Sequence, residues 1–409
     1  MRTAVIVVGD LGRSPRMQYH AASLAAAGSD VDLIGLEGAA VMRMLASDPR
    51  IRVHRIRDRA FAGRARGGVR RFVYGSAARG IQQAITIFVT SMRIARPDVI
   101  LVQNPPAFPT LFVGWLVARL RGARFIIDWH NLSHTIAAVK VGIHHRAVKA
   151  LARSERRWAR RADAHLTVSK TFAEWLKREY GVVATVVYDR PSSAFVRPTP
   201  EAASALWQKL VREAQLPDAR LPIVVCPTSW TPDEDFDLLL EALERAERTL
   251  TRQHGDAPAL AVLLTGRGPL RETFETRLAR RNLKAIVVRM LWLEPEDYPT
   301  LVGMADLGLC LHQSSSGLDL PMKLADLSGA GIPVAVYDYS PVLGEVMTAG
   351  QHGTLFRDPG DLAALLVAAA TGTVTPDSPV AKSRVWLAQH PPERWSEQWD
   401  ATARAVLVR

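Results

Sequence analysis

A serine- and glycine-rich stretch in the second half of the sequence has the residue types that bind a diphosphate. It follows an apolar run and precedes a segment with helical spacing; its members are Ser314, Ser315, Ser316 and Gly317. Such a loop at a helix N-terminus presents backbone N–H and hydroxyl donors to an anion. Lys323 adds a positive charge about one turn into the helix, and Asp326, on the same face, can accept hydrogen bonds from ribose hydroxyls. The alternative is a capped amphipathic helix with solvated charges.

A second polar group, Asp128-Trp129-His130-Asn131, ends an apolar run in the first half of the sequence. Polar side chains at the carboxyl end of a parallel strand point toward the ligand-binding edge of the sheet. Histidine can act as a general base near neutral pH, and a nearby aspartate can orient it. We therefore expect His130 to be a base and Asp128 its orienter. The alternative is a helix cap beside a packed histidine.

The sequence Gly9-Asp10-Leu11-Gly12-Arg13-Ser14-Pro15 follows the first apolar run. Its glycines permit a tight turn, Ser14 is suited to cap a helix, and Pro15 fits the first helical turn. With Arg13 and Arg16 nearby, we expect a phosphate-facing loop. The spacing is not G-x-G-x-x-G, so no nicotinamide or flavin fingerprint is present. A plain strand-to-helix turn is the alternative.

Gly266-Arg267-Gly268-Pro269 is a further turn after an apolar run. It could contact an anion through Gly266 and Gly268, but the motif alone is weakly diagnostic.

The acidic triplet Asp233-Glu234-Asp235 resembles the metal-binding motif Asp-x-Asp. It precedes a helical segment, where acidic residues complement the helix dipole, and we favour that interpretation. The sequence has no His/Cys cluster with zinc spacing. We therefore expect neither a metal ion nor another cofactor.

Short apolar runs alternate with amphipathic segments along both halves of the chain, a pattern typical of parallel sheets covered by helices. A proline- and serine-rich stretch at 189–200 interrupts the alternation and predicts an interdomain linker. The expected fold is α/β, with one Rossmann-like domain over 1–190 and another over 191–392, facing a cleft. A final helix within 393–409, carrying Trp395 and Trp399 on one face, could pack back on the first domain.

Positive charge is concentrated in the first half of the chain. Residues 1–190 contain 31 Lys and Arg against 13 Asp and Glu, whereas the remainder contains 21 and 27. Nine of the arginines lie between Arg50 and Arg71. Such a surface suits an anionic partner, and we expect it to bind an anionic membrane peripherally. No stretch approaches the roughly 20 apolar residues that a membrane span needs, so we expect a cytoplasmic protein on the inner face of the cell membrane.

The segment from Pro321 to Val334 resembles the P-x-K-x-x-E-x-x-A-x-G-x-P-V signature of GT-B glycosyltransferases, with Asp326 for Glu and Gly329 for Ala. Seven stretches in order along the chain are similar to the eukaryotic chitobiosyldiphosphodolichol β-mannosyltransferase family. They are GDLGRSPRMQYH (Gly9–His20), QNPP (Gln103–Pro106), IDWHN (Ile127–Asn131), TSWTPDEDF (Thr228–Phe236), TGRGPLRE (Thr265–Glu272), WLEPEDYP (Trp292–Pro299) and HQSSSGLDLPMK (His312–Lys323).

This resemblance implies an inverting β-mannosyltransferase of GT-B fold that uses GDP-mannose, acts on an isoprenoid-diphosphate saccharide and needs no metal. On that basis the first domain binds the acceptor and the second the nucleotide sugar. Expected donor contacts are Ser315, Ser316, Gly317 and Lys323 to the diphosphate, Asp326 to ribose, Asp319 to the hexose, and Trp292 and Leu293 to the base. Gly9, Gly12 and Arg13 would face the acceptor, and His130 would be the base, with Asp128 or Asp10 as substitutes.

Three other functions fit parts of the sequence. A glycosyltransferase using another nucleotide sugar in polysaccharide or glycolipid synthesis would share every motif. A sugar-nucleotide epimerase of the same architecture would convert its donor without an acceptor. The high pI of about 10.1 suggests a nucleic-acid-binding protein, but the arginine-rich segment contains no recognisable RNA- or DNA-binding module, so we expect no nucleic-acid partner.

Overall fold

The computed structural model describes residues 1–57, 69–372 and 378–408. Residues 58–68, half of the Arg50–Arg71 segment, therefore lie outside the described residues. Within the described ranges, no helix is both long and apolar enough to cross a bilayer.

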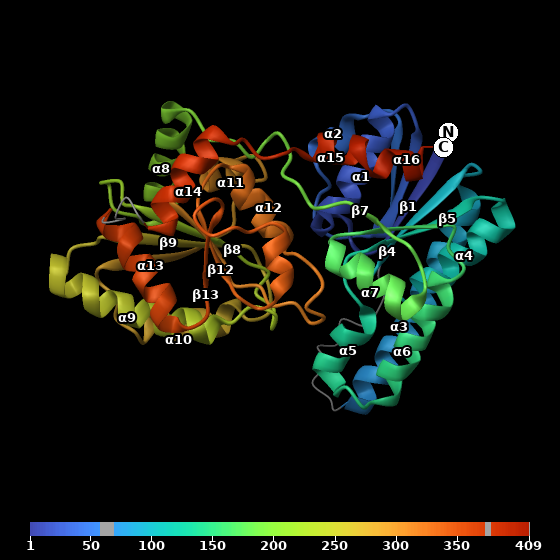
Figure 1. The fold of residues 1–409 in the computed structure, drawn as a ribbon, viewed down its shortest axis with the longest axis horizontal. Helices are drawn as coiled ribbons and strands as arrows, with labels where there is room; N and C mark the ends of the chain where they lie inside the picture. The colour runs from blue at the N-terminus through green and yellow to red at the C-terminus, as the bar shows by residue number, and fades with distance from the viewer. Residues whose placement is uncertain (58–68, 373–377, 409) are drawn as a thin grey trace. The chain divides into compact units, whose positions relative to one another are not determined.

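The chain forms two compact units (Figure 1), one made of Met1–Asp189 with Ser396–Arg409, the other of Arg190–Trp395. Each unit has a parallel sheet with helices on its faces, so the predicted fold class, two Rossmann-like doubly wound domains, is confirmed. The reason lies in the apolar runs: strands buried on both faces need continuous Val, Ile and Leu rather than alternation.

The N-terminal unit has a seven-stranded sheet in the order β3-β2-β1-β4-β5-β6-β7. Its strands are β1 (Arg2–Asp10), β2 (Asp30–Leu36), β3 (Ile51–Ile56), β4 (Val99–Asn104), β5 (Arg124–Trp129), β6 (Ala164–Thr167) and β7 (Thr185–Val186). Its helices are η1 (Leu11–Arg13), α1 (Pro15–Ala26), α2 (Arg43–Ser47), α3 (Val69–Arg93), α4 (Thr110–Arg121), α5 (Ser133–Val141), α6 (Arg146–Ala159) and α7 (Lys170–Tyr180).

The end of the chain completes this unit. Helices α15 (Trp395–Ala401) and α16 (Ala403–Leu407) follow the last residues of the other unit. The Trp399 side chain is buried, and its indole N–H donates to His20 Nδ1 at 3.0 Å. Arg124 also donates to the carbonyl oxygen of Val406 at 3.0 Å. The C-terminal segment is therefore part of the core around α1 and β5.

The C-terminal unit has a six-stranded sheet in the order β10-β9-β8-β11-β12-β13. Its strands are β8 (Ile223–Pro227), β9 (Leu260–Thr265), β10 (Ile286–Leu291), β11 (Leu307–Cys310), β12 (Val334–Tyr337) and β13 (Gly353–Phe356). Its helices are α8 (Pro200–Ala214), α9 (Phe236–His254), α10 (Arg271–Ala279), α11 (Asp297–Met304), α12 (Met322–Gly329), η2 (Pro341–Glu345), α13 (Pro359–Thr371) and α14 (Pro379–Gln389).

The strand order reverses between β1 and β4 in one sheet and between β8 and β11 in the other. Ligands bind at such switch points, outside the carboxyl ends of the strands. The loops that follow these four strands are therefore the places to look for a site.

Candidate active site

A buried ion-pair network lies at the carboxyl end of β5. Arg16 donates from Nε and Nη2 to the two oxygens of Asp128 at 2.8 and 3.0 Å, and from Nη1 to Asp189 at 2.8 Å. Burial alone would raise the pKa of Asp128, but the Arg16 charge and hydrogen bonds from His130 and His20 hold it well below its usual range. The expectation that Arg16 helps to bind a phosphate is wrong, because its guanidinium is buried between two carboxylates.

Two histidines complete this network. His130 Nε2 lies 2.8 Å from Asp128 Oδ2, and His20 Nε2 lies 3.2 Å from the same oxygen. Burial lowers the pKa of His20, and its Nδ1 accepts from Trp399. Neutral His20 therefore carries its proton on Nε2, facing Asp128. His130 Nε2 faces the Asp128 carboxylate in the same way, and its side chain is 18% exposed.

The Asp10 carboxylate organises the turn after β1. It accepts from the backbone N–H of Gly12 at 3.0 Å and of Ala39 at 2.9 Å. Gly9 lies within β1 rather than in the turn. Arg13 is more exposed, with Nε 3.8 Å from Asp10. Asp10 therefore has a structural task, whereas Arg13 presents its charge toward solvent.

The start of α1 differs from the prediction in one respect. Pro15 occupies the first position as expected, but the Ser14 side chain does not cap the helix. Its hydroxyl donates instead to the carbonyl oxygen of Asp10 at 3.0 Å, which ties the helix start to the preceding turn.

A second buried carboxylate, Glu155, was not recognised from the sequence. It accepts from Asn104 Nδ2 at 3.0 Å, from the backbone N–H of Ser133 at 2.7 Å and from His134 Nδ1 at 2.5 Å. The Tyr180 hydroxyl also donates to it at 3.4 Å. Glu155 comes from α6 but holds together the loops that follow β4 and β5. Its position on a strongly amphipathic, arginine-rich helix gave no local signal of burial.

In the C-terminal unit, Lys323 of α12 forms an ion pair with Glu234. Glu234 is buried and also accepts from the Thr228 hydroxyl at 2.6 Å and the Ser229 N–H at 2.9 Å. The ammonium of Lys323 is thus held at the edge where β8 and β11 end. Asp326, one turn along, is half-buried.

The predicted serine loop is folded around Asp319. Both Ser314 and Ser316 donate their hydroxyls to this carboxylate, the latter at 3.2 Å. The Gly317 N–H donates to Ser314 Oγ at 2.8 Å, and Gly317 has a φ of 70°, which favours glycine. Ser315 is the exposed member of the loop. Asp319 therefore holds the loop in its conformation. The sequence analysis expected Asp319 only to contact the hexose.

His312, which is partly buried, lies at the start of this loop. Its Nδ1 lies 3.2 Å from Asp233 and its Nε2 lies 3.4 Å from Asp319. Burial alone would lower its pKa, but hydrogen bonds to both carboxylates raise it to about 9. The imidazolium therefore places a positive charge beside the serine loop. The sequence analysis did not single out this residue.

The three acidic residues of the Asp233–Asp235 triplet have separate partners. Asp233 binds His312, Glu234 binds Lys323, and Asp235 caps α9 by accepting from two backbone N–H groups. The helix-start interpretation therefore holds for Asp235. Among the residues that the structure describes, no group of three or more His, Cys, Asp or Glu is arranged to hold a metal ion.

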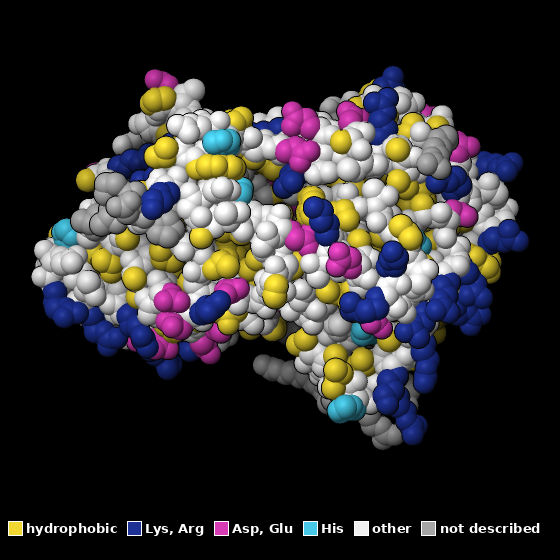
Figure 2. All heavy atoms as spheres, in the orientation of Figure 1, with side chains coloured by type: hydrophobic (Ala, Val, Ile, Leu, Met, Phe, Trp, Pro, Cys, Tyr) yellow, Lys and Arg dark blue, Asp and Glu magenta, His cyan; other side chains and the backbone are white. Residues whose placement is uncertain are grey.

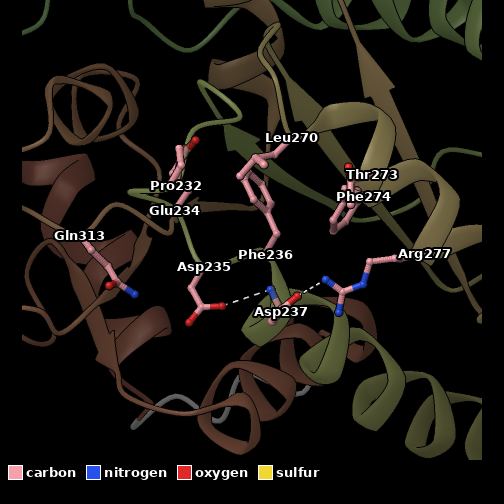
Figure 3. Close-up of a pocket in the computed structure, with 10 residues that line it drawn as sticks. All are labelled: Pro232, Glu234, Asp235, Phe236, Asp237, Leu270, Thr273, Phe274, Arg277 and Gln313. Atoms are coloured by element: carbon pink, nitrogen blue, oxygen red, sulfur yellow. Dashed lines mark hydrogen bonds and ion pairs between the residues drawn. The ribbon is translucent and has the colours of Figure 1, made fainter. Parts of the chain in front are cut away.

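A cavity beside this triplet has an aromatic floor and a charged rim (Figure 3). Phe236 and Phe274 line it, and so do Asp237 and Arg277, which form an ion pair. Glu234 also lines it, so the cavity adjoins the Lys323 ion pair. The predicted serine loop, Trp292 and Asp326 are not among its lining residues.

The glycine turn after β9 is packed against the loop after β8. A Cβ on Gly266 would lie 1.9 Å from the carbonyl oxygen of Thr228, and one on Gly268 would lie 2.0 Å from that of Ser229. Glycine is therefore needed at both positions because the two backbone segments pack closely, whether or not the turn also contacts an anion.

Trp292 follows the edge strand β10 and is 49% exposed, with Leu293 half-buried beside it. The Arg267 guanidinium lies 4.0 Å from the centre of the indole ring, a cation–π arrangement that covers one face of the ring. An aromatic ring held in this way remains available for stacking on its other face.

Comparison with known proteins places both units in glycosyltransferase families. Residues 12–188 match the glycosyl transferase 4-like domain, and residues 208–370 match glycosyl transferases group 1. Among solved structures, HepE of Anabaena in complex with UDP and glucose is similar, with a TM-score of 0.68, 16% identity and 98% of each chain covered. At that identity the likeness shows the fold alone.

Curated relatives are closer in sequence. The chitobiosyldiphosphodolichol β-mannosyltransferase of mouse is 34% identical, covering 99% of this chain and 88% of the mouse protein. That of Yarrowia lipolytica is 36% identical, covering 87% and 76%. A protein of Arabidopsis thaliana named UDP-glycosyltransferase TURAN is 32% identical, covering 100% and 97%. The chain is therefore a GT-B glycosyltransferase and belongs to the chitobiosyldiphosphodolichol β-mannosyltransferase family.

Proposed function

We propose that the chain transfers mannose from GDP-mannose to a saccharide carried on an isoprenoid diphosphate, forming a β-1,4 linkage with inversion. One observation carries the proposal. The seven stretches that resemble the mannosyltransferases follow β1, β4, β5, β8, β9, β10 and β11, and each reaches the carboxyl end of its strand. A likeness concentrated at the ligand-binding edges of both sheets concerns the site and not only the scaffold.

In this proposal the C-terminal unit binds the donor. Ser315, Ser316 and Gly317 donate to the diphosphate, while Lys323 and His312 supply positive charge to the departing GDP. Two cations held by buried carboxylates are preorganised for that charge, since no solvent must reorient when it develops.

The remaining donor contacts are part of the same proposal. Asp326 accepts from the ribose hydroxyls and Asp319 contacts the hexose from within the loop. Trp292 stacks on the base beside Leu293, and the turn at Gly266 and Gly268 supports the base from below. The donor is a substrate, and we propose that no metal ion or other cofactor takes part.

The N-terminal unit binds the acceptor, with Gly12 and Arg13 on the acceptor side. The acceptor hydroxyl oxygen attacks the anomeric carbon opposite the phosphate, and the carbon–phosphate oxygen bond breaks with its electron pair leaving on GDP. His130 Nδ1 takes the hydroxyl proton, and Asp128 stabilises the resulting imidazolium through Nε2–H. Asp128 itself is enclosed by Arg16 and two histidines, so it orients rather than accepts the proton.

A transfer assay with radiolabelled nucleotide sugars tests this function. We expect mannose transfer from GDP-mannose to chitobiose on an isoprenoid diphosphate, and no change in GDP-mannose without acceptor. The name of the Arabidopsis relative gives UDP sugars as the rival donors. Calorimetry showing UDP-hexose bound more tightly than GDP-mannose, with UDP-hexose turnover, would overturn the donor assignment.

We further propose that the enzyme binds the inner face of the cell membrane peripherally. The described part of the arginine segment supports this: Arg52, Arg55 and Arg57 are exposed on or beside β3, an edge strand of the sheet. Each basic residue near an anionic surface contributes about 1 kcal/mol, screened by salt. Flotation with anionic vesicles should fall at high salt. Equal flotation with neutral and anionic vesicles would contradict the assignment.

A further inference from the structure

An apolar groove in the N-terminal unit lies between α5 and α6. Ile136 and Val141 of α5 face Ala150 and Leu151 of α6 across it, and Phe108 from the loop after β4 closes one side. Its volume of about 500 Å³ is within the range of small-molecule sites, roughly 300–1,000 Å³. The proposed transfer chemistry uses none of these side chains.

Large apolar side chains continue from the groove onto the surface. Phe108 is 46% exposed, and Val139 on α5 and Ile143 just beyond the end of this helix are each 69% exposed. The Phe108 ring lies against α3, because a Cβ on Gly80 would be 2.8 Å from it. Soluble proteins seldom expose such residues together unless they contact an apolar partner.

The inner end of the groove belongs to the same sheet edge as His130. Ser133, which lines the groove, is three residues beyond His130, and its hydroxyl accepts from the Ala107 N–H at 2.6 Å. Glu155 fixes this corner through Asn104 and the Ser133 N–H. From there the groove follows α5, whose nine residues span about 13 Å. A ligand in the groove would therefore have one end at the loop that carries the proposed base.

Positive charge surrounds the apolar lining. Lys140 lines the groove, and Arg146, Lys149 and Arg153 are exposed on α6. The acidic residue of α6, Glu155, is buried and engaged. Figure 2 shows hydrophobic side chains over α5 beside Lys and Arg side chains over α6. An apolar channel with a basic border suits a long hydrocarbon chain that ends in a diphosphate.

We propose that this groove binds the first units of the isoprenoid chain of the acceptor, an inference that rests on the proposed function. The groove suits a single hydrocarbon chain better than a flat bilayer surface. The reason is that small residues from both helices leave a channel between its walls. These residues, Ala137, Ala147 and Ala150, leave room for a branched chain between the helices. The groove then selects acceptors by their lipid and sets the distance from diphosphate to His130.

Binding measurements without turnover test the inference. We expect the wild-type chain to bind geranylgeranyl diphosphate at least tenfold more tightly than inorganic diphosphate. Ala150→Trp fills the groove from an exposed position and should abolish this preference. Ala152→Trp, the same change on the same helix but outside the lining, is the matched control and should retain it. Ala137→Phe on the opposite wall provides a second blocking variant if Ala150→Trp does not fold.

The outcomes separate the rival explanations. Equal affinity of the wild type for the two diphosphates, or unchanged preference in both blocking variants, would overturn the inference. If the blocking variants keep geranylgeranyl diphosphate but lose binding to phosphatidylcholine vesicles, the groove is a bilayer contact and the inference is wrong. If the wild type prefers geranylgeranyl diphosphate but does not transfer mannose, the proposed function is wrong and the assignment of the isoprenoid groove stands.

Discussion

Replacing His130 by alanine removes the proposed base while disturbing little else. The side chain is 18% exposed and forms a hydrogen bond with Asp128. General-base assistance is typically worth about 10²–10⁴ in rate, which corresponds to about 3–5 kcal/mol in the barrier. We therefore expect His130→Ala to lower kcat at least 10²-fold. GDP affinity should change little, because the proposed donor contacts belong to the other unit.

The companion variant Asp128→Asn keeps the size of the side chain and removes its charge. Arg16 then retains one carboxylate, Asp189, at 2.8 Å. Removing one partner of a buried ion pair costs about 3–5 kcal/mol, so this variant should lose stability as well as kcat. Because the two residues act as a unit, the double variant should lose little more kcat than His130→Ala alone.

The assay is single-turnover transfer with saturating acceptor, beside calorimetric titration of GDP and thermal unfolding of each variant. Near wild-type kcat for His130→Ala under these conditions would refute the assignment of the base. Asp10 would then lead, because Asp128 is fully enclosed whereas Asp10 is partly exposed.

Three further predictions concern the C-terminal unit. Asp326→Ala should weaken GDP binding about tenfold or more, since a hydrogen bond to a charged group contributes about 1.5–3 kcal/mol; unchanged affinity in calorimetry would exclude the ribose role. The pKa of His312 is raised to about 9 because its imidazolium binds two carboxylates. The stability that these ion pairs contribute is fully present below pH 6.5 and is lost as pH rises through about 9. Unfolding free energy should fall by about 3 kcal/mol across that window, and the slope should flatten in His312→Gln; an equal slope in both proteins would refute this. Gly268→Ala should lower the melting temperature, because its Cβ would meet the Ser229 carbonyl, with overpacking costing about 1–3 kcal/mol. The control Gly344→Ala, which meets no atom within 4 Å, should be neutral.

The elements that carry the site were predictable because their signals are local. Buried parallel strands appear as apolar runs, and the polar residues after them must lie at the carboxyl edge of the sheet. The contact between His130 and Asp128 was predictable because both residues lie where β5 ends, two positions apart in the sequence. Pro15 at the start of α1 follows from its own backbone preference.

Pairings between distant segments were not predictable, since spacing carries no information about them. Arg16 meets Asp128 across 112 positions, and Lys323 meets Glu234 across 89. Arg16 resembled a surface arginine of a phosphate loop because the sequence does not show which way α1 faces. Glu234 resembled a helix-dipole residue for the same reason, although its neighbour Asp235 does cap the helix.

Two of the buried carboxylates, Asp128 and Glu234, point to a division of chemistry between the units. Asp128 is paired with Arg16, a cation that keeps its proton, and with two histidines, groups that can exchange theirs. Glu234 is paired with Lys323, a hydroxyl and a backbone N–H, so its surroundings fix a positive charge in place. A reaction in which a hydroxyl loses a proton and a diphosphate gains negative charge needs both settings. We infer that the N-terminal unit manages the proton and the C-terminal unit the charge of the leaving group.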